Sequence, residues 1–378
     1  MKKISKTPVA LGLALCLLSA PALAQSSVSI YGVLDMGLSF DSDGNGGKAT
    51  RLGSGYVSGS RLGFSGNEDL GGGLRALFVL EMGVDGDTGA TRTFQDPSSA
   101  SAAASGGLNT TGFGRRAHVG LGGSFGTVLL GRDYTPLFWS GAALDPMSFG
   151  YYGDLQEFGT LSGTGIERFG RASNGIFYTS PELGGFTARL MYSFGSESTG
   201  VAGRPPEDAN KMAAIGGTYR AGPLLVSGAF QQLKLPLVSG GQFTGTGNRN
   251  DAIIGASYST DRFTVSTGFA RIDQPGPHTT GDDVWLGASY TVGAGKVFGT
   301  VQRIRQEAGP RPGDNTATTY ALAYMYSLSK RTGLYVSYGY VANGDTASFA
   351  LLAGDPVLAP GAVGANPRGT VFGIRHAF

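Results

Sequence analysis

The sequence predicts an all-β protein, a transmembrane antiparallel up-and-down β-barrel of about sixteen strands. Three observations support this class. Apolar residues alternate with small or polar ones along most of the chain, which is the period of strands with two different faces. Connections are alternately short and long, and the apolar column of the clearest strands carries no charge. A strand-rich membrane protein is therefore expected rather than a helical one.

The chain begins with the features of a cleaved secretory signal peptide, residues 1–24. Three lysines precede an apolar stretch from Val9 to Leu18, and Ala22-Leu23-Ala24 matches a signal peptidase site. Cleavage would remove Cys16, the only cysteine, so we expect neither disulfides nor thiolate metal sites in the exported domain, residues 25–378. It would also change the formal charge from +2 to −1, which gives no reason to expect a nucleic-acid partner.

The predicted strands follow one another in pairs. An opening strand is expected near Val28 to Phe40, and a closing strand near Thr370 to Phe378. Between them, seven pairs of alternating segments are each joined by a tight turn rich in Gly, Pro, Asp and Ser. The first turn lies within G-N-E-D-L-G-G-G, and the others begin at Gly122, Pro181, Arg220, Ser259, Thr291 and Leu328. Because the count is even, the first strand begins and the last strand ends at the same rim of the barrel.

The connections between these pairs are long and polar. They cover roughly residues 41–59, 87–114, 133–173, 195–211, 234–250 and 343–369. Short turns at one rim and long loops at the other are typical of bacterial outer-membrane barrels.

The charge pattern indicates which face meets lipid. Columns such as Tyr320, Leu322, Tyr324 and Tyr326 contain no charged residue, and a lysine or arginine at mid-bilayer would cost about 2–4 kcal/mol. The opposite column carries arginines, Glu81 and serines, which suit a wet interior. A water-soluble sandwich or propeller would also turn an apolar face inward, so the polar column is what favours the membrane barrel. The inward apolar residues Leu77, Val79 and Met325 have no explanation at this level.

Several sequence blocks resemble the general porins of β-proteobacterial outer membranes. They are S-V-S-I-Y-G-V-L-D-M-G, G-S-R-L-G-F-S-G-N-E-D-L-G-G-G-L-R-A, F-G-T-V-L-L-G-R-D, S-N-G-I-F-Y-T-S-P-E-L-G-G-F and the terminal G-I-R-H-A-F, in order over essentially the whole exported chain. The resemblance implies a sixteen-stranded barrel in the Gram-negative outer membrane, usually a homotrimer, with the third long loop folded into the pore.

The resemblance also gives the last strand a role. Its alternating positions Phe372, Ile374, His376 and Phe378 match the address that the outer-membrane assembly machinery reads, after which the strand closes the sheet against the first one. The alternative is a terminal strand that serves closure alone. Membrane lipid and lipopolysaccharide are the other partners expected of such a barrel.

Selectivity is expected where the third long loop meets the wall. The candidate wall residues are the arginines that strand parity turns inward, and the candidate loop residues are the acids of segment 133–173. Rings of charge of this kind set pore selectivity. The inward arginines outnumber the inward acids, which favours a weak anion preference, and the loop acids oppose it. The wall residues are Arg61, Arg75, Arg116 and Arg189, and the loop residues are Asp145, Asp154, Glu157 and Glu167.

Motifs of catalysis and metal binding fail in their context. Gly122 to Gly126 spells G-x-S-x-G, but a strand follows where a nucleophile elbow needs a helix. The three histidines are scattered, so no metal site is expected, and no glycine loop precedes a helix to hold a nucleotide cofactor. We therefore expect no enzyme but a passive diffusion channel for ions and small hydrophilic solutes. The alternatives are a substrate-selective porin and a barrel-anchored surface adhesin or receptor.

Overall fold

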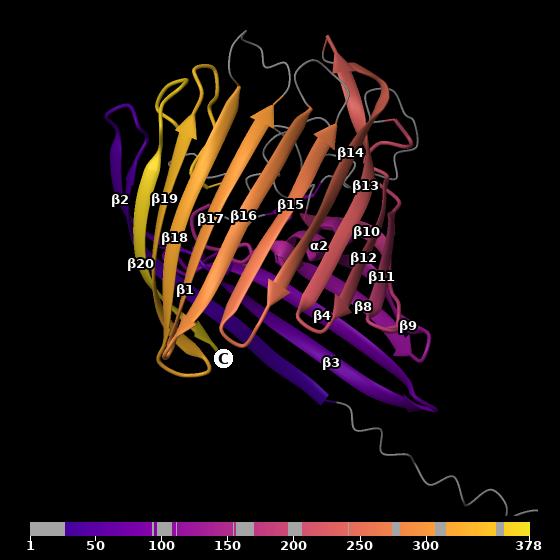
Figure 1. Cartoon of the computed structure of the whole chain (residues 1–378). Coiled ribbons are helices and arrows are strands. Elements are labelled where there is room, and N and C mark those ends of the chain that lie inside the picture. Colours follow the sequence, from indigo (N-terminus) through magenta and orange to yellow (C-terminus); the bar gives the residue numbers. More distant parts are fainter. Residues whose placement is uncertain are drawn as a thin grey trace, which may run out of the picture.

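The computed structural model describes residues 27–92, 94–96, 108–110, 112–153, 155, 170–195, 206–240, 242–273, 280–306, 315–352 and 359–378. Within these residues sixteen long strands form one closed antiparallel ring (Figure 1), which confirms the predicted barrel. Strands that follow one another in the ring are paired, and β1 closes it against β20, from Val33 opposite Ala377 to Ser42 opposite Arg368. The predicted signal peptide lies outside the described residues.

The ring strands are β1 (Ser27–Ser42), β3 (Arg61–Gly71), β4 (Leu74–Asp85), β8 (Arg116–Gly123), β9 (Gly126–Tyr134), β10 (Arg171–Thr179), β11 (Phe186–Ser193), β12 (Met212–Ala221), β13 (Leu224–Ser239), β14 (Gln242–Ser259), β15 (Phe263–Asp273), β16 (Gly281–Val292), β17 (Gly295–Gln306), β18 (Thr316–Ser327), β19 (Thr332–Asn343) and β20 (Arg368–Ala377). The tight turns gather at the bottom of Figure 1, called here the short-turn rim, and the long connections at the top, the long-loop rim.

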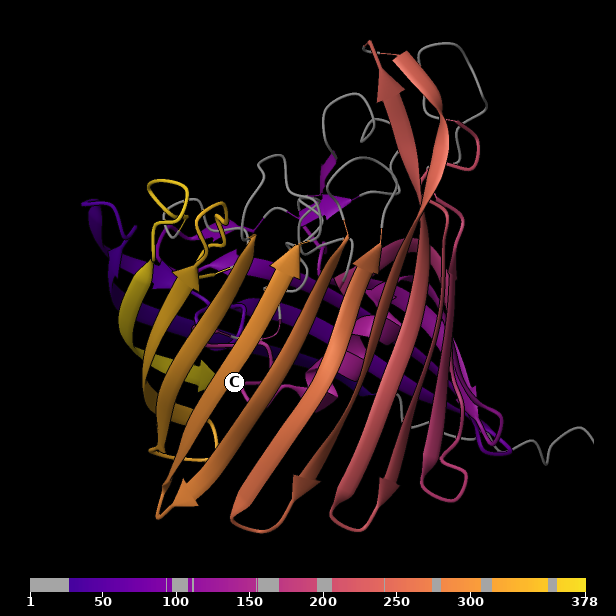
Figure 2. The same cartoon turned by 45° about the horizontal axis from the view of Figure 1, so that its top comes forward.

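Some segments predicted as loops contain strands. β2 (Lys48–Ser54) pairs with the upper part of β1, whose lower part pairs with β3. β13 and β14 remain paired out to Ser239 opposite Gln242, so the segment predicted as loop 234–250 is a hairpin that rises above the rim (Figure 2). Strands beyond the hydrocarbon need no apolar outer column, so the alternation that identifies the wall strands is missing there. The remaining short strands are β5 (Ala90–Thr91), β6 (Phe94–Asp96) and β7 (Leu108–Thr110).

The two faces of the wall follow the predicted alternation. On β18 and β19 the side chains of Leu322, Leu334 and Tyr338 are exposed on the outside, whereas Ser337 between them is fully buried inside. On β11, Leu190 and Tyr192 are exposed and Ser193 is buried. The apolar column is thus the outer surface of the ring, where lipid replaces water as the solvent.

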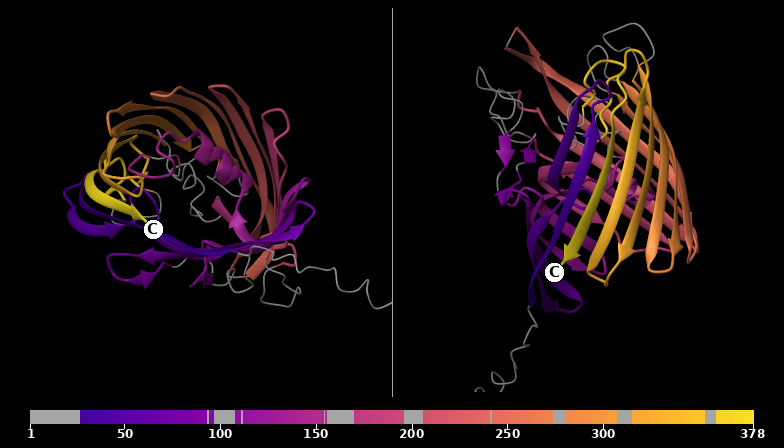
Figure 3. Two further views of the ribbon diagram at one scale, coloured as in Figure 1. Left: turned by 90° about the horizontal axis from the view of Figure 1, so that it is seen from below. Right: turned by 90° about the vertical axis from the view of Figure 1, so that its left-hand side faces the viewer.

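The third long connection folds into the ring after β9. It opens with α2 (Pro136–Leu144), which is capped by Thr135, whose hydroxyl accepts a hydrogen bond from the Phe138 backbone N–H at 3.1 Å, while Pro136 occupies the first turn. α2 lies inside the barrel in the view from below (Figure 3) and packs against β12, β13 and β14. The fold thus matches the inward third loop that the resemblance implied.

After α2 the chain crosses to the opposite side of the ring. The Tyr152 hydroxyl donates to Asp41 Oδ1 on β1 at 2.9 Å, and its backbone N–H donates to Ser337 Oγ on β19 at 3.2 Å. The Gly153 carbonyl accepts hydrogen bonds from Thr300 Oγ1 and from Gln302 Nε2 on β17. The described part of the loop is therefore fixed to the wall at both ends.

The apolar core lies between this loop and the inner wall. Met325, whose inward position the sequence left unexplained, packs against it. The loop contributes Leu137, Leu144, Met147, Tyr151, Tyr152 and Leu155, and the wall contributes Leu225, Ile253, Ala270, Ile272, Trp285, Phe298, Ile304, Ala317, Ala321, Ala323, Tyr335, Val341 and Val371. These wall residues come from β13 to β20, so the loop is held by that half of the ring.

Candidate functional site

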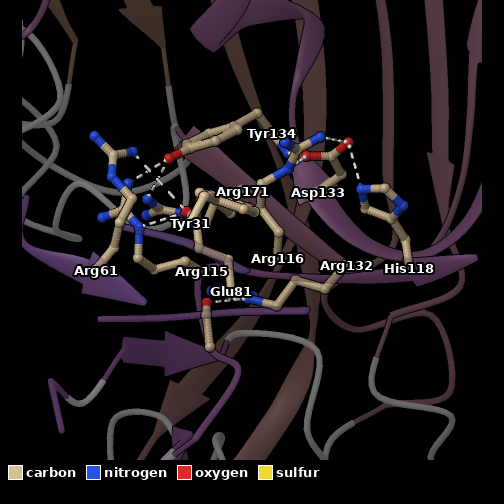
Figure 4. Close-up of polar contacts among 11 residues, drawn as sticks. Tyr31, Arg61, Glu81, Arg115, Arg116, His118, Arg132, Asp133, Tyr134 and Arg171 are labelled. Atoms are coloured by element: carbon tan, nitrogen blue, oxygen red, sulfur yellow. Dashed lines mark hydrogen bonds and ion pairs between the residues drawn. The ribbon is translucent and has the colours of Figure 1, made fainter. Parts of the chain in front are cut away.

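Charged side chains gather on the other part of the inner wall, near the point where the third loop enters the barrel. We call this group the arginine cluster (Figure 4). It is built where β3, β4, β8, β9 and β10 come together, which the antiparallel order of the ring requires. Its members are Arg61, Arg115, Arg116, Arg132, Arg171, Tyr31, Glu81, His118, Asp133 and Tyr134.

Tyr134, the last residue of β9, is the centre of the cluster. Its hydroxyl oxygen accepts hydrogen bonds from Arg115 Nη2 at 2.7 Å and from Arg171 Nη2 at 3.0 Å. The Arg171 guanidinium carbon also lies 4.5 Å from the centre of the Tyr134 ring, in cation–π contact. One tyrosine therefore holds two arginines that would otherwise repel each other.

Glu81 on β4 neutralises part of this charge. It accepts a hydrogen bond from Arg115 Nε at 2.7 Å and one from the Tyr31 hydroxyl at 3.0 Å. Arg61 is held more loosely, because its Nη1 lies 4.0 Å from Glu81 Oε1. No hydrogen bond of the Arg61 guanidinium is found within the part of the chain that the structure describes.

Asp133 on β9 pairs with the next arginine. Arg116 donates to it in the two-pronged geometry that suits a carboxylate, from Nε to Oδ1 at 2.8 Å and from Nη2 to Oδ2 at 3.1 Å. His118 Nε2 lies 3.5 Å from Asp133 Oδ2. Arg132 bonds to the Gly114 carbonyl at 2.6 Å and to Ser173 Oγ at 2.8 Å, so it also braces the entry of the loop.

The balance of charge in the cluster is positive. Among the described residues it brings together five arginines and two carboxylates, Glu81 and Asp133. Arginine keeps its proton even when crowded by other cations, so the excess remains at any physiological pH. Such a surface attracts hydrated anions and repels cations.

The structure brings two of the four predicted wall arginines into this cluster, Arg61 and Arg116. It places the other two elsewhere. Arg75 is exposed at the start of β4, at the short-turn rim, where its Nε lies beside Gly122. Arg189 lies on β11 with its guanidinium carbon 5.8 Å from the centre of the Trp139 ring of α2. Strand parity gives the face of a residue but not its height along the barrel or its position round the ring.

The predicted loop acids do not face the arginines where the structure describes them. Asp145 is buried in its own loop, and its carboxylate accepts hydrogen bonds from the backbone N–H groups of Met147, Phe149 and Leu155 at 2.8, 2.9 and 3.2 Å. Burial raises the pKa of Asp145 to about 6 despite these donors. Asp154, Glu157 and Glu167 lie outside the described residues. Asp145 is thus a loop-shaping residue, and the described acids beside the arginines belong to the wall.

The last strand shows the predicted alternation. Phe372, Ile374 and His376 on β20 and Phe378 directly after it are exposed and form one outer column, and the His376 ring nitrogen Nδ1 lies 2.8 Å from Thr332 Oγ1 on β19. The backbone of Phe378 exchanges two hydrogen bonds with Gly32 on β1, each 3.1 Å long. A Cβ on Gly32 would lie 2.3 Å from the Phe378 ring. The ring of Phe378 can therefore pack over residue 32 only because that residue has no side chain.

Sequence reasoning missed three central members of the cluster, Arg115, Tyr134 and Arg171. All three lie at strand ends, where alternation no longer defines a face. One signal was available, because the residues flanking an inward loop must be neighbours on the wall. Tyr134 and Arg171 lie just inside the two ends of the longest predicted connection, residues 133–173, and are paired in the sheet. In the described residues no three His, Cys, Asp or Glu side chains are grouped so as to hold a metal ion, and no helix is long and apolar enough to cross a membrane.

Comparisons with known proteins agree with this geometry. Residues 10–346 match the family model of Gram-negative porins. The outer membrane porin protein 32 of Delftia acidovorans is 33% identical over 97% of this chain and 99% of its own. An outer membrane porin protein of Bordetella pertussis is 28% identical over 85% of this chain and 90% of its own. The solved anion-selective porin from Comamonas acidovorans has a TM-score of 0.78 and 31% identity, over 94% of this chain and all of its own. The chain therefore belongs to the family of Gram-negative porins, which are β-barrels of the outer membrane.

Proposed function

We propose that this porin lets ions and small hydrophilic solutes diffuse passively across the outer membrane, with a preference for anions and without catalysis. The observation that carries the preference is the arginine cluster, in which Tyr134 binds both Arg115 and Arg171 while Arg61 makes only a 4.0 Å ion pair. The likeness to the solved anion-selective porin from Comamonas acidovorans supports the same assignment.

The arrangement explains how a wide aqueous barrel could discriminate by charge. The third loop is held by the apolar half of the inner wall, so the space left for water borders β3, β4, β8 and β9. Arg61 and Arg116 are half-buried there. Arg115, Arg132 and Arg171 are buried and act on this space through their charge alone. An anion there needs no specific contact, because a unit charge about 6 Å from a guanidinium in water gains roughly 0.7 kcal/mol. Several such charges favour anions severalfold while leaving transport fast and passive.

Planar-bilayer recordings test this function. We expect stepwise openings and, in a KCl gradient, a reversal potential with the sign of anion preference. A clear cation preference would refute the assignment to the cluster. Electrical silence of correctly folded protein would favour the alternative of a barrel that only anchors surface loops.

We further propose that the porin assembles as a homotrimer among lipid and lipopolysaccharide, and that the assembly machinery recognises its last strand. The exposed column of Phe372, Ile374 and Phe378 supports such recognition, since these side chains are free for a partner before lipid covers them. Conductance steps in threes, together with chemical cross-linking, would test the trimer. Deleting Phe378 should reduce insertion in cells while leaving detergent refolding intact, and normal insertion would show that the strand serves closure alone.

A further inference from the structure

A second cationic region lies on the short-turn side of the third loop, away from the arginine cluster. Between α2 and the wall there is a hollow of about 290 Å³, close to the lower end of the roughly 300–1,000 Å³ of small-molecule sites. Its lining comes from α2, from the β10–β11 turn and from the inner faces of β11 and β12. The residues that matter are Trp139, Glu182, Arg189 and Arg220. We call this hollow the vestibule pocket.

The cations of the vestibule pocket form no ion pair with a carboxylate among the described residues. Arg189 and Arg220 are close enough for their charges to repel. Neither makes an ion pair or a side-chain hydrogen bond within the residues that the structure describes, in contrast to Arg115 and Arg116 in the cluster. Glu182 also lines the hollow, at its turn end. Two unneutralised guanidinium groups on one small hollow favour the binding of an anion.

An indole ring forms the other wall of the pocket. Trp139 remains 37% exposed inside the barrel, and the Arg189 guanidinium carbon lies 5.8 Å from the ring centre. Edge contacts with Tyr134 and Phe138, at 5.5 and 5.9 Å between ring centres, fix the orientation of the indole. A rigid and half-exposed aromatic face beside two free cations provides both an apolar surface and a charge partner.

The pocket continues into a second hollow along α2. The two share Ala142, Ala143 and Arg220, and the second has a volume of about 370 Å³. Its lining includes five hydroxyl groups, the Asp145 carboxylate and Lys296. The hydroxyl groups are those of Ser148, Ser257, Ser259, Thr264 and Ser289. This polar groove extends from the pocket along the short-turn side of the loop.

We propose that the vestibule pocket is a weak binding site for planar aromatic carboxylates, the benzoate class, with the carboxylate between Arg189 and Arg220 and the ring on Trp139. This inference rests on the proposed channel function, because the ligand reaches the pocket through the lumen. Chloride or acetate would gain from the arginines alone, and a neutral aromatic from the indole alone. The combination therefore selects an anion with a flat apolar body.

Current recordings on the wild-type channel test the site. Benzoate added at millimolar concentration should block the chloride current transiently, whereas acetate and benzyl alcohol should not. Replacing the charge by Arg189→Gln should weaken the block about tenfold, since a charge-assisted hydrogen bond contributes about 1.5–3 kcal/mol, and 1.4 kcal/mol is a factor of ten. Arg75→Gln is the matched control, because Arg75 lies exposed at the same rim but lines neither hollow.

Fluorescence gives a second readout that does not depend on conductance. 4-Nitrobenzoate should quench the emission of Trp139, measured as the quenching that a Trp139→Phe variant loses, and 4-nitrobenzyl alcohol should quench it less. Equal effects of acetate and benzoate on the current, or a block unchanged by Arg189→Gln, would overturn the proposal. Open-channel conductance and anion preference report separately on the channel function, so loss of benzoate block with normal conductance refutes only the site.

Discussion

Arg61 offers the sharpest test of how this porin selects ions. In the arginine cluster it is the member with the weakest restraint, because its Nη1 lies 4.0 Å from Glu81 Oε1 in a long ion pair and its guanidinium makes no hydrogen bond among the described residues. Glu81 keeps its bonds to Arg115 and Tyr31 when Arg61 is replaced. The Arg61→Gln variant should therefore fold normally and change the field with little change of shape.

The expected change follows from Coulomb's law. The interaction energy between a monovalent ion and a guanidinium about 6 Å away is roughly 0.7 kcal/mol in water, favourable for an anion and unfavourable for a cation. Screening at 0.1 M salt lowers it to roughly 0.4 kcal/mol. Loss of Arg61 should then disfavour chloride about twofold and favour potassium about twofold. The ratio of chloride to potassium permeability should fall by about fourfold.

Reversal potentials in KCl gradients measure this ratio directly. The screening length is about 3 Å at 1 M salt, so the effect of Arg61→Gln should fall below about 1.5-fold there. Arg331→Gln is the control, since Arg331 lies exposed in the turn between β18 and β19. An unchanged permeability ratio at low salt, or an equal change in the control, would refute the assignment of selectivity to the cluster.

Three further predictions concern the loop that narrows the lumen. Tyr152→Phe leaves the buried Asp41 carboxylate without a 2.9 Å hydrogen bond and should lower the free energy of unfolding by about 1–3 kcal/mol, measured by denaturation in detergent. Gly287→Val would force atoms against Pro146, whose Cγ lies 2.4 Å from the added Cβ, so it should push the loop inward and lower the single-channel conductance; an unchanged conductance would contradict this packing. Burial raises the pKa of Asp145 to about 6 in the folded protein. As the pH rises, this carboxyl therefore loses its proton at a lower pH in the unfolded chain than in the folded one. The stability that protonated Asp145 contributes, roughly 3 kcal/mol, should be full below about pH 4 and lost by pH 7, and Asp145→Asn should reduce this pH dependence.

The strands and their faces could be read from the sequence because lipid imposes a simple rule. Outward residues in the middle of a wall strand meet hydrocarbon, so Leu322 and Tyr338 alternate with inward residues such as Ser337 and reveal both the strand and its orientation. The same rule fails above the bilayer. The extension of β13 and β14 to Ser239 and Gln242 meets water on both faces. Its residues therefore lack the apolar alternation of a wall strand, and the sequence predicted a loop there.

The candidate site was only partly predictable, for a geometric reason. Alternation places Arg61, Arg75 and Arg189 on the same inner face, but a barrel separates residues by strand number and by height as well. Arg75 therefore lies at the rim and Arg189 beside α2, while Arg61 reaches Glu81. The missing information is which loop folds inward and against which wall, and this depends on packing between residues far apart in the chain.

The distribution of inward apolar residues links fold and selectivity. An inward Ile253, Trp285 or Phe298 would be costly in a lumen filled with water, and the third loop covers these side chains. The loop therefore lies on the half of the ring from β13 to β20, and water remains where the wall carries arginines. Apolar burial decides where the open passage runs, and the net positive charge of the arginine cluster beside that passage decides which ions pass. A variant that moves the loop should thus alter selectivity even with every arginine in place, and Gly287→Val would show this as a changed permeability ratio alongside its lower conductance.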